Sequence, residues 1–140
     1  CWAACVKAVY EHVFGRKIAL STVLGKLPVG AYAGATLDET KAVLASLGIC
    51  SSRKFKRLSH DGMKWQLRHR GPIICGVNTG NMSGHMVVLY GFKGKNVWVM
   101  DPGKYGGILG GKTKHRFDEF KKKWTATIFD IGVGGGGGAG

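Results

Sequence analysis

The stretch HMVVLYGFKGKNVWVMD, residues 85–101, contains two short apolar segments separated by a turn. Residues 85–92 and 96–100 are rich in β-branched and aromatic side chains, and the Lys-Gly-Lys between them is typical of a hairpin. This pattern predicts two sequential antiparallel strands. The run IICGV at 73–77 and the residues 125–131 predict further strands.

Upstream of Pro72 the apolar residues instead recur at helical spacing. Helices are predicted over residues 2–14, 36–47 and 60–70, with shorter helical turns at 21–27 and 117–124. The middle helix begins with a capping box, in which Thr36 and Glu39 each accept a hydrogen bond from the other's backbone N–H. Helices followed by strands predict an α+β fold, with an N-terminal helical half packed on an antiparallel β-sheet.

The length of 140 residues suits one hydrophobic core and is short for two. A content of 44% hydrophobic and 21% charged residues is that of a globular protein and excludes a disordered chain. We expect one domain over residues 1–131 and a flexible Gly-rich tail over residues 132–140, part of which could be an engineered linker. No apolar run reaches the roughly 18 residues of a membrane span.

The chain is strongly basic, with 21 Lys and Arg against 8 Asp and Glu and a net charge of +13. Such a charge attracts polyanions and acidic proteins. The basic residues are spread along the sequence, and no zinc finger, helix-turn-helix or aromatic platform accompanies them. We therefore interpret them as a solvated basic surface and do not expect nucleic acid as the main partner.

Four cysteines, at positions 1, 5, 50 and 75, form no Cys-x-x-Cys pair, which argues against structural zinc. We expect no metal and no cofactor. Cys1 and Cys5 lie one helical turn apart, a poor geometry for a disulfide, so free thiols and a reducing compartment are predicted. Cys5, Cys50 and Cys75 lie in apolar runs and are expected to be buried structural residues.

Cys1 directly precedes the first amphipathic helix. A helix N-terminus and a nearby imidazolium both depress a thiol pKa and so make a nucleophile. His85 opens one apolar strand, and Asp101 ends the strand predicted beside it. Each residue alone has a plain structural interpretation. Together and in this order, Cys1, His85 and Asp101 fit the nucleophile, base and orienting acid of a thiol hydrolase.

These segments resemble papain-like cysteine peptidases. Cys1-Trp2-Ala3-Ala4 resembles the nucleophile segment, and the blocks at 84–92 and 97–102 resemble the histidine and acid strands. The helix near 35–47 and the strand after Pro72 fall where the bacteriocin-processing branch keeps them. That branch supplies the peptidase domains of ABC transporters that cut after Gly-Gly, and it is similar to protease domains of bacterial effectors and toxins. The resemblance covers residues 1–131.

The resemblance implies a cysteine endopeptidase that cuts a protein or peptide after small residues such as Gly-Gly, in a narrow cleft for which Trp2 and Trp98 are candidate lining residues. The family's glutamine upstream of the nucleophile is not seen here, and Gln66 does not match it. With no transporter segment following, a free-standing or toxin-borne protease is expected. It would work in a reducing bacterial cytoplasm, if need be after delivery into a target cell, and the net charge suits an acidic immunity protein.

Three alternatives remain open from the residues alone. The same triad could serve an acyltransferase or a deamidase. Cys1 could instead act as an N-terminal nucleophile with its own α-amine as base. Outside enzymology, the charge could belong to a basic nucleic-acid-binding module.

Overall fold

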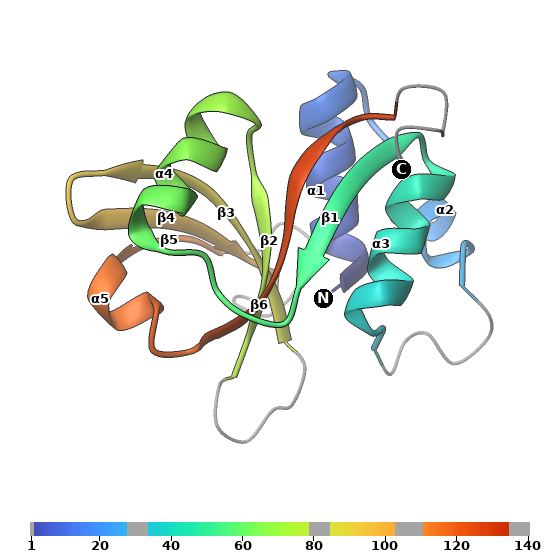
Figure 1. Ribbon diagram of the computed structural model, residues 1–140. Coiled ribbons are helices and arrows are strands. Elements are labelled where there is room, and N and C mark those ends of the chain that lie inside the picture. The colour runs from blue at the N-terminus through green and yellow to red at the C-terminus, as the bar shows by residue number, and fades with distance from the viewer. Residues whose placement is uncertain (1, 28–33, 79–84, 103–110, 135–140) are drawn as a thin grey trace.

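The computed structural model describes residues 2–27, 34–78, 85–102 and 111–134. In chain order the elements are α1 (Trp2–Phe14), α2 (Leu20–Leu24), α3 (Leu37–Ser46), β1 (Ile49–Lys54), α4 (His60–His69), β2 (Ile73–Val77), β3 (His85–Lys93), β4 (Asn96–Asp101), β5 (Gly111–Arg116), α5 (Phe117–Phe120) and β6 (Trp124–Val133). The strands form one antiparallel sheet in the order β1-β6-β2-β3-β4-β5 (Figure 1). The predicted α+β class is confirmed.

Each face of the sheet carries its own apolar cluster. Met86 and Val88 of β3 pack with residues of α1, α2 and α3, whereas Val87 and Leu89 of the same strand pack with residues of α4 and α5. Figure 1 shows the corresponding separation, with α1 to α3 grouped apart from α4 and α5. Because side chains alternate between the faces of a strand, β3 needs apolar residues at successive positions. This explains its uninterrupted apolar run.

Local signals set the ends of the helices. Helix α1 ends before Gly15, whose φ of 66° lies in the left-handed region that glycine adopts most readily. The predicted capping box of α3 is present: Glu39 N donates to Thr36 Oγ1 at 3.0 Å, and Thr36 N donates to Glu39 Oε1 at 2.8 Å. Helix α3 therefore begins as the sequence predicts, and this fixes its first turn beside the sheet.

Two features of the sheet were not predicted from the sequence. Strand β5 was not predicted, and it pairs with β4 at the sheet edge. The last strand, β6, does not extend the sheet beyond its neighbours in sequence but lies between β1 and β2. It also continues to Val133, and Gly134 N donates to Gly48 O at 2.7 Å. In the described part of the chain no helix is long and apolar enough to cross a membrane.

Candidate active site

His85 and Asp101 are in direct contact. His85 Nε2 lies 2.6 Å from Asp101 Oδ1, with the histidine side chain 7% exposed and the aspartate side chain 26% exposed. A carboxylate only accepts hydrogen bonds, so the ring nitrogen that faces it carries the proton and donates. In the neutral ring this leaves Nδ1 as the nitrogen able to accept a proton. The contact thus defines both the orientation and the tautomer of the imidazole.

The sheet register brings these two side chains together. Strands β3 and β4 pair antiparallel, with Val88 opposite Met100. This pairing brings the start of β3, where His85 lies, beside the end of β4, where Asp101 lies. The chain achieves the contact because His85 begins one strand and Asp101 ends the next.

The first turn of α1 lies close to this pair. Cys1, the predicted nucleophile, is outside the described residues, and α1 begins at the next residue, Trp2. Helix α1 packs on β3. Cys5, one turn into the helix, belongs to the same buried cluster as Met86 and Met100, the neighbours in sequence of His85 and Asp101. Burial, with a smaller contribution from the negative charge of Asp101, raises the pKa of the Cys5 thiol to about 12.

A groove of about 440 Å³ opens beside His85. The start of α3, the ends of β2 and β3 that meet at their shared loop, and the start of β6 form its walls. Its lining residues are Ala35, Thr36, Leu37, Gly76, Val77, Asn78, His85, Met86, Thr125 and Ala126. Apart from the imidazole, the described lining residues contain one other nitrogen-bearing side chain and two hydroxyls, so this part of the groove offers a peptide mainly apolar walls.

Two paired strand positions in this groove carry small residues. Gly76 of β2 pairs with Ala126 of β6, and a Cβ added at Gly76 would lie 3.1 Å from Ala126 Cβ. That distance is tighter than an ordinary carbon–carbon contact. The two backbones are therefore close, and glycine is the residue that fits there without displacing its neighbour. Nothing in the sequence pattern marked Gly76, Ala126 or Ala35 as groove residues.

Trp2 and Trp98, the two tryptophans predicted to line the cleft, are not among the described residues of the groove wall. Trp2 is buried in the core cluster that α1 shares with the sheet. Trp98 is half-buried in β4, where it pairs with Gly91 and Lys114. Neither is among the described residues that line the groove. Their role in substrate binding stays a prediction.

The remaining cysteines and Gln66 have structural surroundings. Cys5, Cys50 and Cys75 are free thiols. Cys5 and Cys75 are buried as expected, but Cys50 is only half-buried because it lies in β1, at the edge of the sheet. Gln66 is held by Asp130: its Nε2 donates to Asp130 Oδ1 at 2.8 Å, and its Oε1 accepts from Asp130 N at 3.0 Å. In the described residues no group of three or more potential ligands could hold a metal ion.

Comparisons with known proteins agree with this geometry. The peptidase C39 family profile matches residues 1–131. The lactococcin-G-processing and transport ATP-binding protein LagD of Lactococcus lactis subsp. lactis is 29% identical over 136 residues, which cover 91% of this chain and 17% of LagD. The chain thus spans about a sixth of the length of that relative.

Solved structures show the same fold. The peptidase domain of Streptococcus ComA, a bifunctional ABC transporter in quorum sensing, superposes with a TM-score of 0.73 at 20% identity, covering 95% of this chain and 90% of that one. A double glycine motif protease solved in complex with a leader peptide gives 0.68 at 21% identity, covering 95% and 84%. The profile match over most of the length shows that this chain belongs to the peptidase C39 family, which consists of papain-like cysteine peptidases.

Proposed function

We propose that the chain is an endopeptidase that cleaves a peptide after a pair of small residues, with Cys1, His85 and Asp101 as its catalytic residues. The observation that carries this proposal is the 2.6 Å contact between His85 and Asp101 at the wall of a groove and near the start of α1. A buried histidine held by a carboxylate beside an open groove is the arrangement that nucleophilic catalysis by a thiol requires.

The mechanism follows from the tautomer. With Nε2–H donated to Asp101, Nδ1 of His85 takes the proton of the Cys1 thiol, and the dipole of the 13-residue helix α1 favours the thiolate at its start. The sulfur attacks the scissile carbonyl carbon. His85 returns the proton to the leaving amine as the C–N bond breaks, and a thioester remains. Water, deprotonated by His85, then hydrolyses the thioester and restores the thiol.

The preference for small residues is supported by the strand positions beside His85. Gly76 and Ala126 bring the backbones of β2 and β6 close together, and their lack of bulk suits an extended substrate backbone with little side chain. The similar protease solved with a leader peptide is described as acting on a double glycine motif, and LagD is described as processing lactococcin G. A leader peptide that ends in Gly-Gly is accordingly the substrate we propose.

Alkylation by iodoacetamide near neutral pH, read by mass spectrometry, tests the catalytic assignment. We expect stoichiometric modification of Cys1, lost in His85→Ala, and no modification of buried Cys5 or Cys75. Cys1→Ala should fold normally and fail to cut a peptide that contains Gly-Gly. An active Cys1→Ala variant contradicts the proposal. A largely active His85→Ala variant indicates the N-terminal amine as base.

The mass change of the substrate distinguishes the related chemistries. Peptide cleavage gives two fragments whose summed mass exceeds that of the substrate by one water. Deamidation leaves one product with the amide replaced by an acid, and acyl transfer joins a fragment to an added amine. A single deamidated or conjugated product from a Gly-Gly peptide would replace the peptidase proposal with one of these alternatives.

We also propose that the enzyme works in a reducing bacterial compartment as part of a toxin or effector, where an acidic immunity protein blocks its groove. The free thiols and the net charge of +13 support this setting. Co-purification from the producing cell tests it: an acidic protein that inhibits cleavage and dissociates at high salt is expected. Recovery of the active enzyme alone, at low salt, would contradict it.

A further inference from the structure

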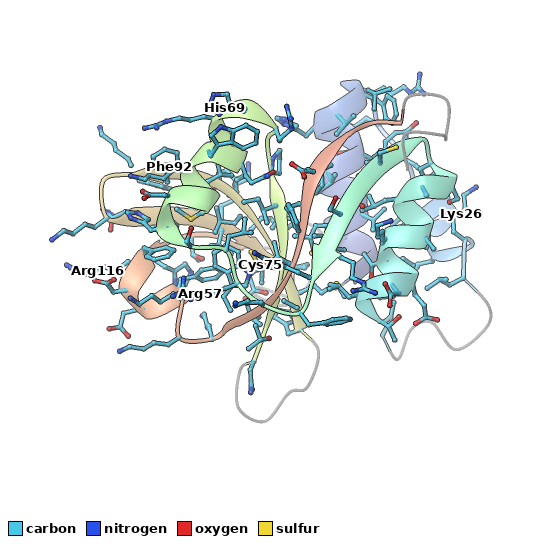
Figure 2. All side chains as sticks on the ribbon, viewed as in Figure 1. Lys26, Arg57, His69, Cys75, Phe92 and Arg116 are labelled. Atoms are coloured by element: carbon cyan, nitrogen blue, oxygen red, sulfur yellow. The ribbon has the colours of Figure 1, made fainter. Side chains whose placement is uncertain are left out.

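A cluster of cationic side chains surrounds the start of β6. It is formed by the last residue of β1, by the connector between β1 and α4 and by the residues that follow α5. This basic patch consists of Lys54, Lys56, Arg57, Lys121, Lys122 and Lys123. In Figure 1 the connector crosses below β6, between β1 and α4, and Figure 2 labels Arg57 in this region.

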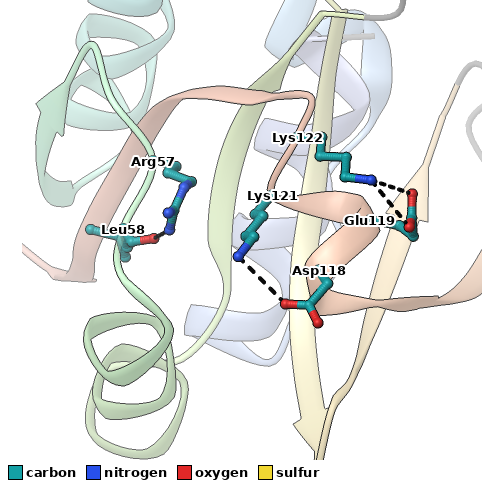
Figure 3. Close-up of polar contacts among 6 residues, drawn as sticks. All are labelled: Arg57, Leu58, Asp118, Glu119, Lys121 and Lys122. Atoms are coloured by element: carbon teal, nitrogen blue, oxygen red, sulfur yellow. Dashed lines mark hydrogen bonds and ion pairs between the residues drawn. The ribbon is translucent and has the colours of Figure 1, made fainter.

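The two halves of the patch meet at one aromatic ring. Arg57 and Lys121 each have their charged group 5.9 Å from the centroid of the Phe117 ring. Arg57 Nη1 also donates to Leu58 O at 2.9 Å, which holds its guanidinium in place (Figure 3). Because both cations share Phe117, the connector and the segment after α5 present one continuous positive surface.

The patch has more positive charge than its own carboxylates can balance. Asp118 lies 3.5 Å from Lys121, and Glu119 lies 3.3 Å from Lys122, both within α5 and its exit (Figure 3). The other four cations have no carboxylate within ion-pair distance among the described residues. The patch therefore has a net positive charge that is available to a partner.

The patch adjoins the groove beside His85. Thr127 Oγ1 donates to Lys56 O at 2.7 Å, and Asn78 N donates to Lys123 O at 2.8 Å. Asn78 and Ala126 both line the groove. The backbones of Lys56 and Lys123 are thus fastened to residues in the groove wall or directly next to it. Through these backbone contacts, the patch begins within one or two residues of the groove wall along β2 and β6.

We propose that the basic patch is an exosite that binds an acidic segment of the peptide substrate, outside the residues held in the groove. This inference rests on the proposed peptidase function and adds a second determinant of the substrate: carboxylates a few residues from the cut. Exposed charge pairs each contribute little, but several acting together on one segment increase affinity and association rate. The exosite lowers KM and leaves kcat unchanged, because it does not contact the reacting bond.

Four peptides with the same residues around a Gly-Gly pair test the exosite. Two contain a short run of Glu, one before and one after the cut, and the other two contain Gln at the same positions. For one of the two placements we expect the Glu peptide to have a KM about tenfold lower than the Gln peptide at low salt, with equal kcat. The difference should shrink as ionic strength rises, because surface charges are screened.

The double variant Lys56→Gln/Lys123→Gln should lose most of this preference and cut the Gln peptide as well as the wild type does. Its backbone carbonyls keep their hydrogen bonds, so the local fold is retained. The matched control is Lys17→Gln/Lys93→Gln, which removes the same charge at two exposed positions that do not line the groove. The control should keep the full preference for the Glu peptide.

Peptide binding to His85→Ala, followed by fluorescence anisotropy, separates this inference from the proposed function. If the Glu and Gln peptides have equal affinity and equal KM in both placements, the exosite is overturned. Cleavage of either peptide still supports the peptidase proposal. Tighter binding of the Glu peptide with no cleavage by the wild type upholds the exosite and overturns the peptidase. A second outcome also overturns the exosite: the wild type binds a DNA oligonucleotide or anionic vesicles, and the Lys56→Gln/Lys123→Gln variant loses this binding but binds the peptides unchanged.

Discussion

Replacing Asp101 with alanine is the sharpest perturbation of the candidate site. The substitution removes the carboxylate oxygen that lies 2.6 Å from His85 Nε2. The Nε2–H of His85, whose side chain is only 7% exposed, then lacks this acceptor. A hydrogen bond to a charged group contributes about 1.5–3 kcal/mol. If that energy orients the imidazole in the transition state, kcat/KM should fall about 10- to 150-fold, since each 1.36 kcal/mol is a factor of ten.

Asp101→Asn is the matched control for this prediction. Its amide oxygen can accept the same proton from His85, and a neutral hydrogen bond contributes about 1 kcal/mol. The asparagine variant should therefore lose about 0.5–2 kcal/mol, which is about 2- to 30-fold in kcat/KM and less than the alanine variant loses. If kcat/KM falls further for Asp101→Asn than for Asp101→Ala, accepting a hydrogen bond from the ring is not the main role of this position.

The assay is cleavage of a Gly-Gly peptide, with the rate of Cys1 alkylation as an independent readout of the thiolate. Thermal unfolding shows whether each variant is folded. An Asp101→Ala protein that unfolds at the wild-type temperature, keeps kcat/KM within about threefold and alkylates Cys1 at the wild-type rate would refute the role given to this contact.

Three further outcomes are expected from the described contacts. Gly76→Ala places a Cβ 3.1 Å from Ala126 Cβ, so it should raise KM for the Gly-Gly peptide severalfold and, because Ala126 must shift, lower the unfolding temperature by a few degrees; an unchanged KM would contradict the place given to Gly76 in the groove. Thr36→Ala removes one hydrogen bond of the capping box with Glu39 and should reduce the free energy of unfolding by about 1 kcal/mol in urea titrations, and a loss below about 0.3 kcal/mol contradicts it. Burial raises the pKa of Cys5 from 9.0 to about 12 in the folded protein, so the unfolded chain releases this proton at lower pH than the folded chain does. The free energy of unfolding should therefore decline as pH rises from about 9 towards 12. Urea titrations across that pH range should show a smaller decline for Cys5→Ala.

The sequence predicts those parts of the fold that depend on local signals. Helix α1 and the capping box of α3 follow from apolar spacing and from residues a few positions apart. The pairing of β3 with β4 follows from a short turn, and with it the approach of Asp101 to His85. In each case the interacting residues are near one another in the chain or linked by a tight hairpin, so the pattern contains the information.

Strand β5 could not be predicted, because its sequence GKTKHR lacks apolar alternation. Only Gly111 in it is buried, and as an edge strand it is held by backbone pairing with β4. The place of β6 is likewise a long-range property: its partner residues in β1 lie more than seventy positions earlier in the chain, as in the pair of Arg53 with Ile128. The groove combines such distant segments, so its lining residues have no local signature.

The position of β6 also determines when the groove beside His85 can form during synthesis. Strand β1, with α3 packed against it, pairs with β6, and β6 pairs in turn with β2. While the chain is still being synthesised, the earlier helices and strands can collapse, but the strand that unites them leaves the ribosome after all the others. The groove wall contributed by Ala126 is then absent. We therefore expect the groove to be complete only after β6 has paired with both β1 and β2.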